Sequence, residues 1–590
     1  MKFQLNEMLT DITKISDLAD TSGYSIELTN ACQAILDRRQ PQLTTVHPES
    51  VGIMSGEFVQ HYTPVVDFLA QCINDKKLIC VAYDYDCDGI TAGVCLTQTL
   101  KLLNANYTSC VPDKIKDGYG LSVRAVKEVA PEPCVVITVD NGITSRDAAK
   151  QLTDEGYTII ITDHHMQEGD LPVAKYIINP KLYCTEQDDE YMGSGCYVAA
   201  KLSMNLMKKY HTHDNTPNLG EGNYHTNYRC SRKSPLYRMY RLACCLTGIS
   251  IVSDVIPLNR TMSAQLQLAL SELPLIEHAG LRALIEMCGF GANIPITSTI
   301  IAFYIAPRIN SAGRIGDPKD AFNLLSYWDM SQGMSMAQTE AAKLRVLNST
   351  RKIMEQTVFE EADLTRADND DVDGIVLFNE NWHPGVVGIV ASRIVEKTNK
   401  PCILLTKQHD GNVTGSGRAP ADCDLLSLLV ECKEYLVKFG GHKVACGVSL
   451  KRENVDAFIA AFNNAAKKYE STEVTVKYDG VVSIPVIQDI RFKEFLNLFQ
   501  PTGNANPNIV MRINNVRITK VERLDMKLKL VVIDSEGRGL QLSKFRPPVE
   551  WEFEEGQVID VLCSISTSYY RGVVNHDYNI EGYQVIQEKK

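Results

Sequence analysis

Short apolar runs alternate with helical patterns in the first part of the chain. Runs rich in β-branched residues occupy positions 79–83, 134–139 and 157–162, and each ends at an acidic or glycine-bearing turn. Such runs are typical of strands that are buried on both faces of a sheet. Helical patterns at Ala92–Leu103 and Val123–Val129 lie between the first two runs. The pattern predicts a parallel α/β sheet, in which ligands bind at the carboxyl ends of the strands.

The pattern changes in the middle of the chain. A polar stretch at 209–235 contains Pro, Gly, Asn and His without a period, which predicts a long surface insertion. Met334–Arg366 is rich in Ala, Glu, Lys and Leu and lacks Gly and Pro, which predicts one long helix that separates two lobes. A second α/β unit is expected beyond this helix, with strands at Gly374–Phe378 and Pro401–Thr406.

The last part of the chain has a β pattern. Strands are expected at Ile509–Val516, Leu528–Ile533 and Val558–Ser564, as in a small barrel. The whole sequence therefore predicts an α/β fold followed by a β-barrel. We expect five parts: an N-terminal extension (1–50), a parallel-sheet domain (51–330), a connecting helix (331–370), a smaller α/β domain (371–470) and a barrel resembling an oligonucleotide-binding fold (471–590).

Composition narrows the class of protein. The chain has 590 residues, too many for one domain of about 100–200 residues, and its 44% hydrophobic and 22% charged residues are ordinary for a globular protein. We find no apolar run that could span a membrane, no secretory signal and no C-x-x-C pair among 18 cysteines. These features predict a cytoplasmic protein with reduced thiols and no membrane contact. The net charge of −12 does not decide whether the chain binds nucleic acid.

Carboxylates and histidines follow the predicted buried strands. They lie in the segments YDYDCDGIT (Asp84, Asp86, Asp88), TVDNGI (Asp140) and ITDHH (Asp163, His164, His165), and a further apolar segment, GISIVSDVIPL, contains Asp254. Because the ends of adjacent parallel strands converge, we expect a cluster of carboxylates with an imidazole. Such a cluster needs a cationic counter-charge, and oxygen-rich sites with one imidazole suit Mn²⁺ or Mg²⁺.

Simpler interpretations explain these residues less well. A single Asp after a strand is more often a turn former or helix N-cap than a ligand, but four such segments in one unit are hard to explain in that way. A calcium loop starting at Asp84 would need Glu at its twelfth position, where Cys95 stands. His211, His213 and Cys230 lie in the polar stretch and suit a solvated loop better than a zinc site.

The order of the segments adds a resemblance to a known family. DYDCDG, TVDNGI, DHH and SDVIPL resemble the motifs of the DHH phosphoesterase superfamily. VPDKIKDGYGLS, APRINSAGRIGDP, WHPGVVGIVASRIVEK, GSGRAP and FGGHKVACG are similar to segments of RecJ nucleases and their DHH-associated domain, DHHA1. The resemblance implies a parallel-sheet DHH domain, joined by a long helix to a smaller α/β DHHA1 domain, with an oligonucleotide-binding barrel behind it.

The resemblance also implies roles for the clustered residues. It implies a centre for two divalent cations, Mn²⁺ or Mg²⁺, held by Asp84, Asp86, Asp140, His164 and Asp254. Asp140 would bridge the cations, and His165 would face the scissile phosphate. Asp163 would orient the histidine pair. Asp88 would either contact a metal-bound water or cap the helix that follows it, and the cap is the favoured role. Two-metal sites activate water and stabilise the attacking and leaving oxygens of an in-line displacement.

Substrate binding is expected on the second lobe and beside the cluster. Ser416 and Arg418 in GSGR suit a terminal 5′-phosphate. Further candidates are Lys114, Tyr119, Arg308, Arg314 and His442. Lys114 stands where RecJ relatives usually carry Arg, Tyr119 could stack on a base, each Arg could instead form a surface ion pair, and His442 could instead be a packed histidine.

Two aromatic and basic stretches are weaker candidates for contacts with DNA. Tyr569, Tyr570 and Arg571 could form a stacking platform on the barrel, or an ordinary strand edge. The run from Arg229 to Arg241 could contact DNA, although such runs are usually solvated faces.

The function implied by the resemblance is metal-dependent 5′-to-3′ exonuclease activity that releases 5′-mononucleotides from single-stranded DNA. It implies roles in DNA repair, recombination and replication, for a monomer that has a helicase or a single-strand-binding protein as partner. Alternatives remain: a DHH phosphodiesterase for short oligonucleotides or cyclic dinucleotides, a non-catalytic replication scaffold, and a pyrophosphatase relative. The barrel disfavours the short-oligonucleotide phosphodiesterase, and the barrel and second lobe disfavour the pyrophosphatase relative. The retained acidic motifs disfavour the scaffold.

Overall fold

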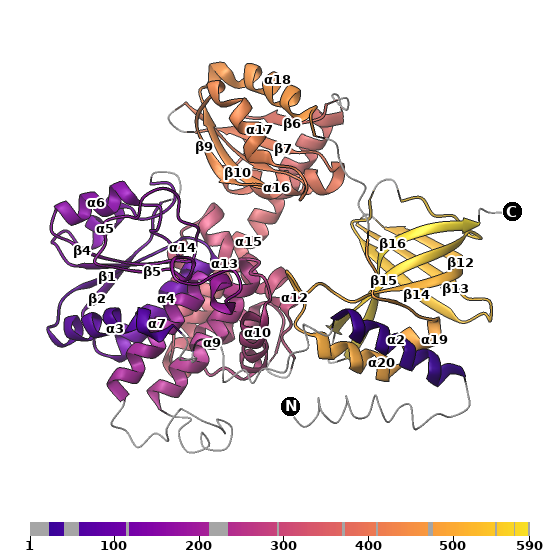
Figure 1. Ribbon diagram of the computed structural model, residues 1–590, viewed down its shortest axis with the longest axis horizontal. Helices are drawn as coiled ribbons and strands as arrows, with labels where there is room; N and C mark the ends of the chain where they lie inside the picture. The colour runs from indigo at the N-terminus through magenta and orange to yellow at the C-terminus, as the bar shows by residue number, and fades with distance from the viewer. Residues whose placement is uncertain are drawn as a thin grey trace.

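The structure is a computed structural model of the chain. It describes residues 23–39, 53, 58–113, 117–211, 234–291, 294–367, 372–408, 411–469, 476–524, 526–548, 551–570 and 573–587. These residues contain three β-sheets, and each sheet with its covering helices is called a unit. The first unit lies on the left of Figure 1, the second at the top and the third on the right. Within these ranges, no helix is both long and apolar enough to cross a membrane.

The first sheet has five parallel strands in the order β2-β1-β3-β4-β5. They are β1 (Ile79–Tyr83), β2 (Tyr107–Cys110), β3 (Val135–Val139), β4 (Thr158–Thr162) and β5 (Tyr176–Ile178). The three predicted strands are confirmed. Their side chains alternate between two cores: Val81 packs with α3 and α7 on one face, and Cys80 packs with α5 and α6 on the other. These helices are α3 (Val59–Asn74), α5 (Val123–Val129), α6 (Arg146–Asp154) and α7 (Gly195–His211).

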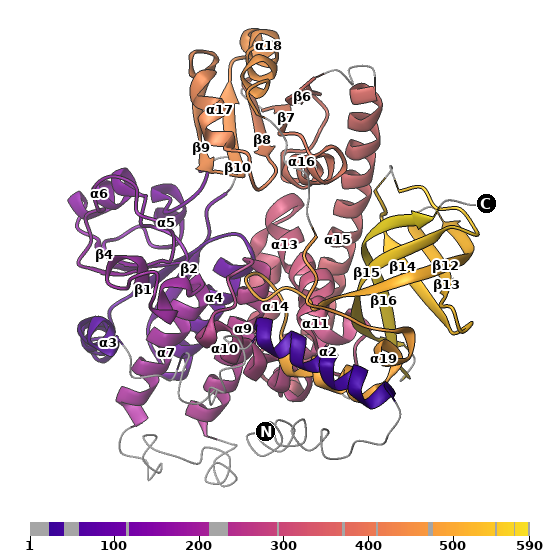
Figure 2. The ribbon, with the colours of Figure 1, turned by 45° about the vertical axis from the view of Figure 1, so that its right-hand side comes forward.

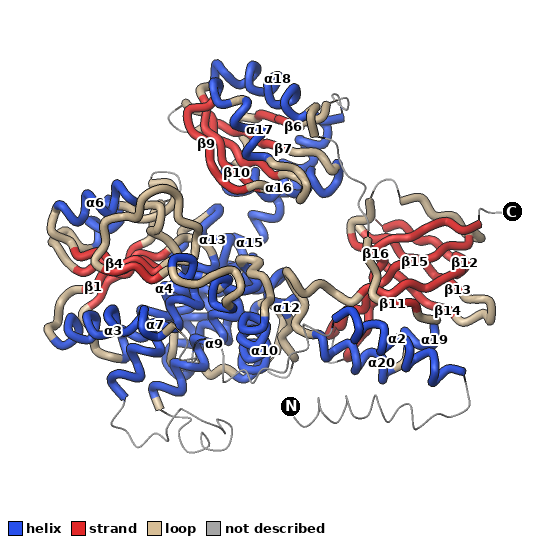
Figure 3. Tube along the Cα trace, in the orientation of Figure 1, coloured by secondary structure: helices blue, strands red, loops and turns tan. Residues whose placement is uncertain are grey.

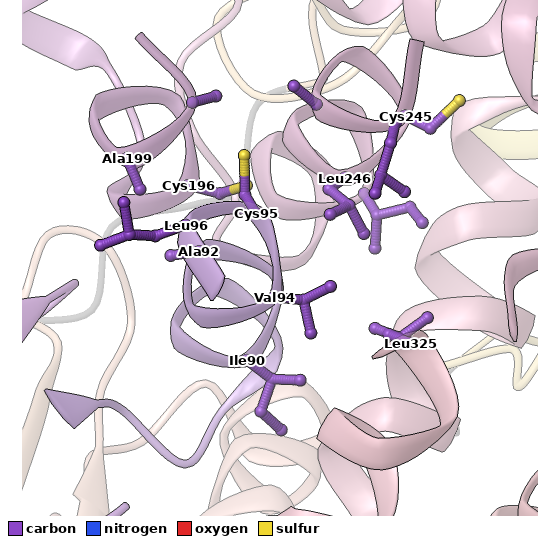
Figure 4. Packing of buried hydrophobic residues seen from close by; sticks show 14 of the residues in the cluster. Ile90, Ala92, Val94, Cys95, Leu96, Cys196, Ala199, Cys245, Leu246 and Leu325 are labelled. Atoms are coloured by element: carbon purple, nitrogen blue, oxygen red, sulfur yellow. The ribbon is translucent and has the colours of Figure 1, made fainter. Parts of the chain in front are cut away.

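A fully enclosed helix carries the first acidic motif. Helix α4 (Cys87–Leu102) packs between α7 and α9 (Pro235–Ser253), with its side chains buried from Cys87 to Leu100. Figure 4 shows Cys95 of α4 beside Cys196 of α7, and Val94 directed between Leu246 of α9 and Leu325 of α14 (Pro318–Ser326). Because α4 is enclosed on all sides, its N-terminus has a fixed position at the end of β1.

Further helices complete this unit, and some of them pack on a long connecting helix. They are α10 (Arg260–Glu272), α11 (Ala279–Met287), α12 (Ser298–Ile300) and α13 (Ala306–Ile315), with a π-helical turn at Ile301–Ile305. The predicted long helix is confirmed as α15 (Met330–Ala367). One end of α15 packs on α11, α13 and α14, and the other packs on α16 (Pro384–Thr398) of the second unit. Figure 2 shows α15 running from the helices of the first unit up along one side of the second unit.

The second sheet is mixed, in the order β6-β7-β8-β10-β9, and only β6 and β7 run parallel. Its strands are β6 (Ile375–Phe378), β7 (Cys402–Lys407), β8 (Val413–Arg418), β9 (Leu436–His442) and β10 (Ala445–Leu450). Helices α16, α17 (Leu425–Glu431) and α18 (Val455–Ala466) cover it. Both strands predicted here are confirmed.

The third sheet confirms the predicted barrel, because pairing of β12 with β15 brings five of its six strands into a nearly closed ring, with β11 added outside the ring on β12. The strands are β11 (Gly480–Val481), β12 (Val510–Leu524), β13 (Lys527–Ile533), β14 (Gly539–Phe545), β15 (Val558–Tyr570) and β16 (Val573–Gln587). Helices α19 (Ile484–Gln488), α20 (Ile490–Leu496) and α2 (Gly23–Arg39) lie at one end of the ring (Figure 3).

Two parts of the chain add to the sequence-based picture. Helix α2, in the expected N-terminal extension, buries Leu28 and Ile35 in the core of the third unit, and Arg39 forms two hydrogen bonds with Asp479 at 2.8 and 3.0 Å. Most of the predicted insertion, residues 212–233, lies outside the described residues, as do His213, Cys230, Arg229, Arg232 and Lys233.

Candidate metal centre

Carboxylate and imidazole side chains gather at the carboxyl edge of the first sheet. Asp84 and Asp86 follow β1, Asp140 follows β3, and His164 and His165 follow β4. Because β1, β3 and β4 are parallel neighbours, their carboxyl ends meet at one edge. This edge is where open α/β sheets bind ligands.

The donor atoms form three overlapping groups. Within each group the atoms lie within 4.8 Å of one another, and the groups are Asp84, Asp86 and Asp140; Asp140, His164 and His165; and Asp88, His164 and Asp254. His164 Nε2 is 3.1 Å from Asp140 Oδ1 and 3.7 Å from Asp254 Oδ2. Asp254 reaches the cluster from the end of helix α9. All five residues expected to hold metal therefore lie together.

The centre of the cluster lacks a counter-charge. Asp84 Oδ1, Asp140 Oδ1 and His164 Nε2 are buried without a hydrogen-bond partner in the described part of the chain. Burial and the repulsion between neighbouring carboxylates raise the pKa values of Asp84, Asp140 and Asp254. Burial and the charge of His165 lower the pKa of His164 to about 3, which keeps the ring neutral. Unpaired carboxylate oxygens beside a neutral imidazole fit hard divalent cations.

Asp140 is held in an uncommon backbone conformation. Its φ of 62° is left-handed, and its N–H donates to the carbonyl of Thr162 at 3.1 Å. Gly195, the first residue of α7, lies against its side chain: a β-carbon on Gly195 would come within 2.4 Å of Asp140 Oδ1. A side chain at position 195 would therefore displace the carboxylate that two of the donor groups share.

Asp163 fixes the second histidine. Its Oδ1 accepts from His165 Nδ1 at 2.8 Å and from the His164 N–H at 2.7 Å, and its Oδ2 accepts from the Ile143 N–H at 2.9 Å. Burial alone would lower the pKa of His165, but the hydrogen bond and charge of Asp163, together with the charges of Asp254 and Asp84, outweigh it and raise the pKa to about 9. The Tyr119 hydroxyl lies 3.2 Å from the same ring. His165 is thus a cationic donor beside the carboxylate cluster.

The expectation that Asp88 caps its own helix is wrong. Asp86 is the N-cap of α4, where its side chain accepts from the Gly89 N–H at 3.0 Å. Asp88 instead accepts from the Gly195 and Cys196 N–H groups of α7, at 2.8 and 2.7 Å, and from Ser250 Oγ of α9 at 2.7 Å. Because Asp88 lies within the first turn of an enclosed helix, its side chain points into the core, where it joins α4 to two neighbouring helices.

A cleft of about 820 Å³ lies between the first and second units, and its lining includes Tyr85, the residue between Asp84 and Asp86, but none of the metal-ligand candidates. Arg314 of α13 and Ser416 of β8 both line it, together with Tyr85 and the N-terminal turn of α16. Burial lowers the pKa of Arg314, a shift that Asp86 opposes. The two units touch here, since a β-carbon on Gly385 would lie 2.0 Å from the Arg314 carbonyl oxygen. The cleft therefore brings Arg314 of the first unit and Ser416 of the second into one lining, which also contains acidic residues such as Asp113 and Glu128.

Arg418 lies two residues beyond Ser416 on strand β8. A β-carbon on Gly388, in the first turns of α16, would lie 3.3 Å from both Arg418 Nη2 and Ser416 Oγ. Arg418 is partly buried, and its Nη1 donates to the Gly417 carbonyl at 2.7 Å. A helix N-terminus with a guanidinium and a hydroxyl beside it suits a phosphate group.

The other predicted substrate residues lie elsewhere. Arg308 donates to the Tyr304 carbonyl of its own helix at 2.6 Å, and His442 is exposed at the end of β9. Neither lines the cleft. Lys114 and Arg571 lie outside the described residues, and Tyr569 and Tyr570 belong to β15.

Sequence reasoning missed several supporting residues. Asn310 Oδ1 accepts from the Cys87 N–H at 2.9 Å, which joins α13 to the first acidic motif. Lys181 donates to the His164 carbonyl, and Trp382 and His383 line the cleft. Asn310 and the pair at 382–383 lie inside segments that the family resemblance had marked, which was a usable signal. Nothing in the sequence distinguishes Lys181 from an ordinary surface lysine.

Unpaired carboxylates and an imidazole at the carboxyl edge of a parallel sheet, with a second α/β unit beyond a long helix, are the arrangement of a phosphoesterase of the DHH class. Comparison with known families agrees: residues 78–221 match the DHH family, N-terminal domain, and residues 371–468 match the DHHA1 domain. The chain belongs to the RecJ family of single-stranded-DNA-specific exonucleases.

Relatives in this family cover most of the chain. The RecJ exonuclease of Dickeya dadantii is 30% identical over 477 residues, which are 77% of this chain and 78% of the relative. The Bacillus subtilis enzyme is 30% identical over 464 residues and 78% of this chain, but the chain spans only 54% of that relative.

Solved structures support the fold. RecJ of Thermus thermophilus in complex with Mn²⁺ covers 96% of this chain and 76% of its own, with a TM-score of 0.74 and 23% identity. An exonuclease RecJ bound to manganese covers 70% of this chain and 95% of its own, with a TM-score of 0.56 and 27% identity.

Proposed function

We propose that this chain is a metal-dependent exonuclease that hydrolyses single-stranded DNA from its 5′ end and releases 5′-mononucleotides. The observation that carries the proposal is the set of buried donor atoms on Asp84, Asp140 and His164 that have no hydrogen-bond partner among the described residues, in donor groups that also include Asp86 and Asp254. Family membership supports the substrate, since the curated relatives act on single-stranded DNA.

The metal centre in this proposal is formed by Asp84, Asp86, Asp140, His164 and Asp254, with Asp140 shared between two divalent cations. Mn²⁺ and Mg²⁺ are the proposed cations, because oxygen-rich sites with one imidazole favour them and the similar Thermus enzyme has been solved with each. When bound, the cations supply Lewis-acid activation of water and neutralise charge at the phosphodiester.

The chain's own residues position the substrate. His165, held by Asp163 and cationic near neutral pH, donates to a non-bridging oxygen of the scissile phosphate. Arg314, Ser416, Arg418 and the N-terminus of α16 bind the terminal 5′-phosphate. A site for a terminal phosphate at a fixed distance from the metal centre makes the enzyme an exonuclease and sets its polarity.

The setting of this activity follows from the same family. We propose that the chain works in the cytoplasm as a monomer in DNA repair, recombination and replication, and that a helicase or single-strand-binding protein presents its substrate. We also propose the division into a DHH domain at 51–330, a connecting helix at 331–370, a DHHA1 domain at 371–470 and a barrel at 471–590. Separate hydrophobic cores in the first, second and third units support this division.

The test is digestion of single-stranded DNA labelled at its 5′ or 3′ end, with a cyclic dinucleotide and a dinucleotide as competing substrates. The proposal expects early release of the 5′ label as a mononucleotide, in Mn²⁺ or Mg²⁺ and not in chelator. Release of the 3′ label first would overturn the polarity. Efficient cleavage of the dinucleotides with no attack on the long strand would favour a short-oligonucleotide phosphodiesterase instead.

A further inference from the structure

The turn that carries Asp254 is strained. Asp254 caps the C-terminus of α9, and its N–H donates to the Ser250 carbonyl at 2.9 Å. The next residue, Val255, has a φ of 53° and is 65% exposed. A β-branched side chain disfavours this left-handed conformation, and the exposed position gives no packing that would compensate. The helix end holds Val255 through two hydrogen bonds of its own, from the Ile256 N–H to the Ile251 carbonyl at 3.0 Å and from the Val255 N–H to the Val252 carbonyl at 3.4 Å. A partner outside the turn can reinforce them.

A loop of the third unit does so. The side-chain amide of Asn504 donates to the Val255 carbonyl at 2.8 Å, and the Asn504 carbonyl accepts from the Leu258 N–H at 2.8 Å. Asn504 thus forms hydrogen bonds with both ends of the 255–258 turn. Next to it, Ser298 Oγ donates to the Thr502 carbonyl at 3.0 Å.

The loop is itself rigid. Asn506 is buried, and its amide donates to the carbonyls of Phe499 and Pro501 at 2.9 and 2.8 Å. The backbone groups of Gly503 and Asn506 also pair with each other, at 2.8 and 3.2 Å. Asn504 lies between these two residues, so it is presented to the turn from a preorganised hairpin.

We propose that Asn504 is a positioning residue of the metal centre. By holding Val255 in its left-handed conformation, it keeps the Asp254 carboxylate 3.7 Å from His164 Nε2. The third unit thereby contributes to the metal centre as well as to any contact with DNA. The inference rests on the proposed function for its catalytic meaning, but its first consequence is a change in metal affinity.

The test is Mn²⁺ binding to the full chain without DNA, followed by electron paramagnetic resonance, in wild type and Asn504→Ala. Loss of the hydrogen bond to Val255 is expected to weaken Mn²⁺ binding about threefold to tenfold. The matched control is Asn508→Ala. Asn508 is in the same loop and accepts from Thr502 Oγ1 at 2.7 Å, so its loss breaks a bond inside the loop and none to the turn. The control should keep the wild-type affinity.

A second variant separates positioning from general stability. Glycine adopts positive φ without steric cost, so Val255→Gly removes the strain that Asn504 opposes. We expect Asn504→Ala to weaken Mn²⁺ binding less in the Val255→Gly background than in wild type. Equal losses in both backgrounds, an unchanged affinity for Asn504→Ala, or an equal loss for Asn508→Ala would each overturn the inference.

The results that would overturn the proposed function differ from those that would overturn the role of Asn504. If wild type binds Mn²⁺ and cleaves no single-stranded DNA, the proposed function is wrong, and the binding comparison still decides the role of Asn504. If wild type cleaves DNA and Asn504→Ala binds Mn²⁺ as wild type does, the proposed function stands and the inference is overturned.

Discussion

At the scale of single residues, the metal centre depends on carboxylates that hold other groups as much as on those that face the cations. Asp163 accepts hydrogen bonds from the N–H groups of Ile143, His164 and His165 and from the His165 ring. It therefore fixes both the backbone and the ring orientation of the second histidine, as carboxylates commonly do for catalytic and ligating imidazoles.

Asp163→Asn should slow cleavage without abolishing metal binding. The amide cannot accept all four hydrogen bonds, so the His165 ring loses its orientation and its raised pKa. We expect the single-turnover rate to fall about 10- to 100-fold, with Mn²⁺ affinity changed less. Asp154→Asn is the control, because Asp154 is exposed and pairs only with Lys150 within α6. A wild-type rate for Asp163→Asn would show that His165 needs no partner.

Arg418 should govern preference for the phosphorylated end. Arg418→Met removes a guanidinium beside Ser416 and α16, so we expect the rate advantage of 5′-phosphorylated over 5′-hydroxyl DNA to fall about tenfold. Arg452→Met removes another guanidinium of the same unit, one that stacks on Phe378, and should leave the advantage intact. An undiminished preference in Arg418→Met would place the terminal phosphate elsewhere.

At the scale of elements, Asp88 links three helices below the cluster. Its carboxylate joins the N-termini of α4 and α7 to Ser250 on α9, and Ser250 Oγ, whose hydrogen goes to Asp88, accepts from the Ser194 hydroxyl at 2.5 Å. These helices carry or contact Asp86, Asp140 and Asp254, so their relative positions set the spacing of the donor atoms.

Ser250→Ala should lower the thermal stability of the first unit. It removes one hydrogen bond from a buried carboxylate, which costs about 1–2 kcal/mol and lowers Tm by about 2–6 °C. Ser253→Ala is the control, since Ser253 is less buried and its hydroxyl bonds the Ser250 backbone carbonyl at 3.1 Å and the Cys87 thiol rather than Asp88. Equal Tm values for the two variants would contradict the role given to the Asp88 network, and thermal unfolding followed by circular dichroism measures both.

How far the sequence predicts the elements depends on burial. Strands β1, β3 and β4 are covered on both faces, so their composition is apolar and their ends were predicted within one residue. Strand β2, with the sequence YTSC, is half-exposed and polar and gave no signal. The direction of Asp88 into the core depends on the packing of α4, which local patterns do not contain.

At the scale of the whole molecule, contacts between distant segments complete the fold and were beyond sequence reasoning. Arg39 and Asp479 pair across 440 residues, and Asn504 reaches Val255 across 249. The cluster itself was predictable, because acidic motifs at strand ends need only a parallel sheet to meet. The hydrogen bond from Asn504 to Val255 was not predictable, because it depends on how the third unit packs against the first.

The cleft between the first two units should be sensitive to their spacing. A β-carbon on Gly385 would lie 2.0 Å from the backbone carbonyl oxygen of Arg314, so Gly385→Ala must separate α16 from α13. We expect KM for single-stranded DNA to rise about tenfold with Mn²⁺ affinity unchanged. Gly539→Ala, where the nearest atom is 3.9 Å away, is the control. An unchanged KM would mean that the substrate does not use this cleft.

The central claim is that hydrolysis occurs at the Asp140 cluster with bound divalent cations. The most direct measurement is single-turnover release of mononucleotide from 5′-labelled single-stranded DNA, in Mn²⁺ and in chelator, by wild type and by Asp140→Asn with its fold verified. We predict release by wild type in Mn²⁺ only, and a rate at least on the order of 10²-fold lower for Asp140→Asn. Release in chelator, or an undiminished rate for Asp140→Asn, would contradict the account.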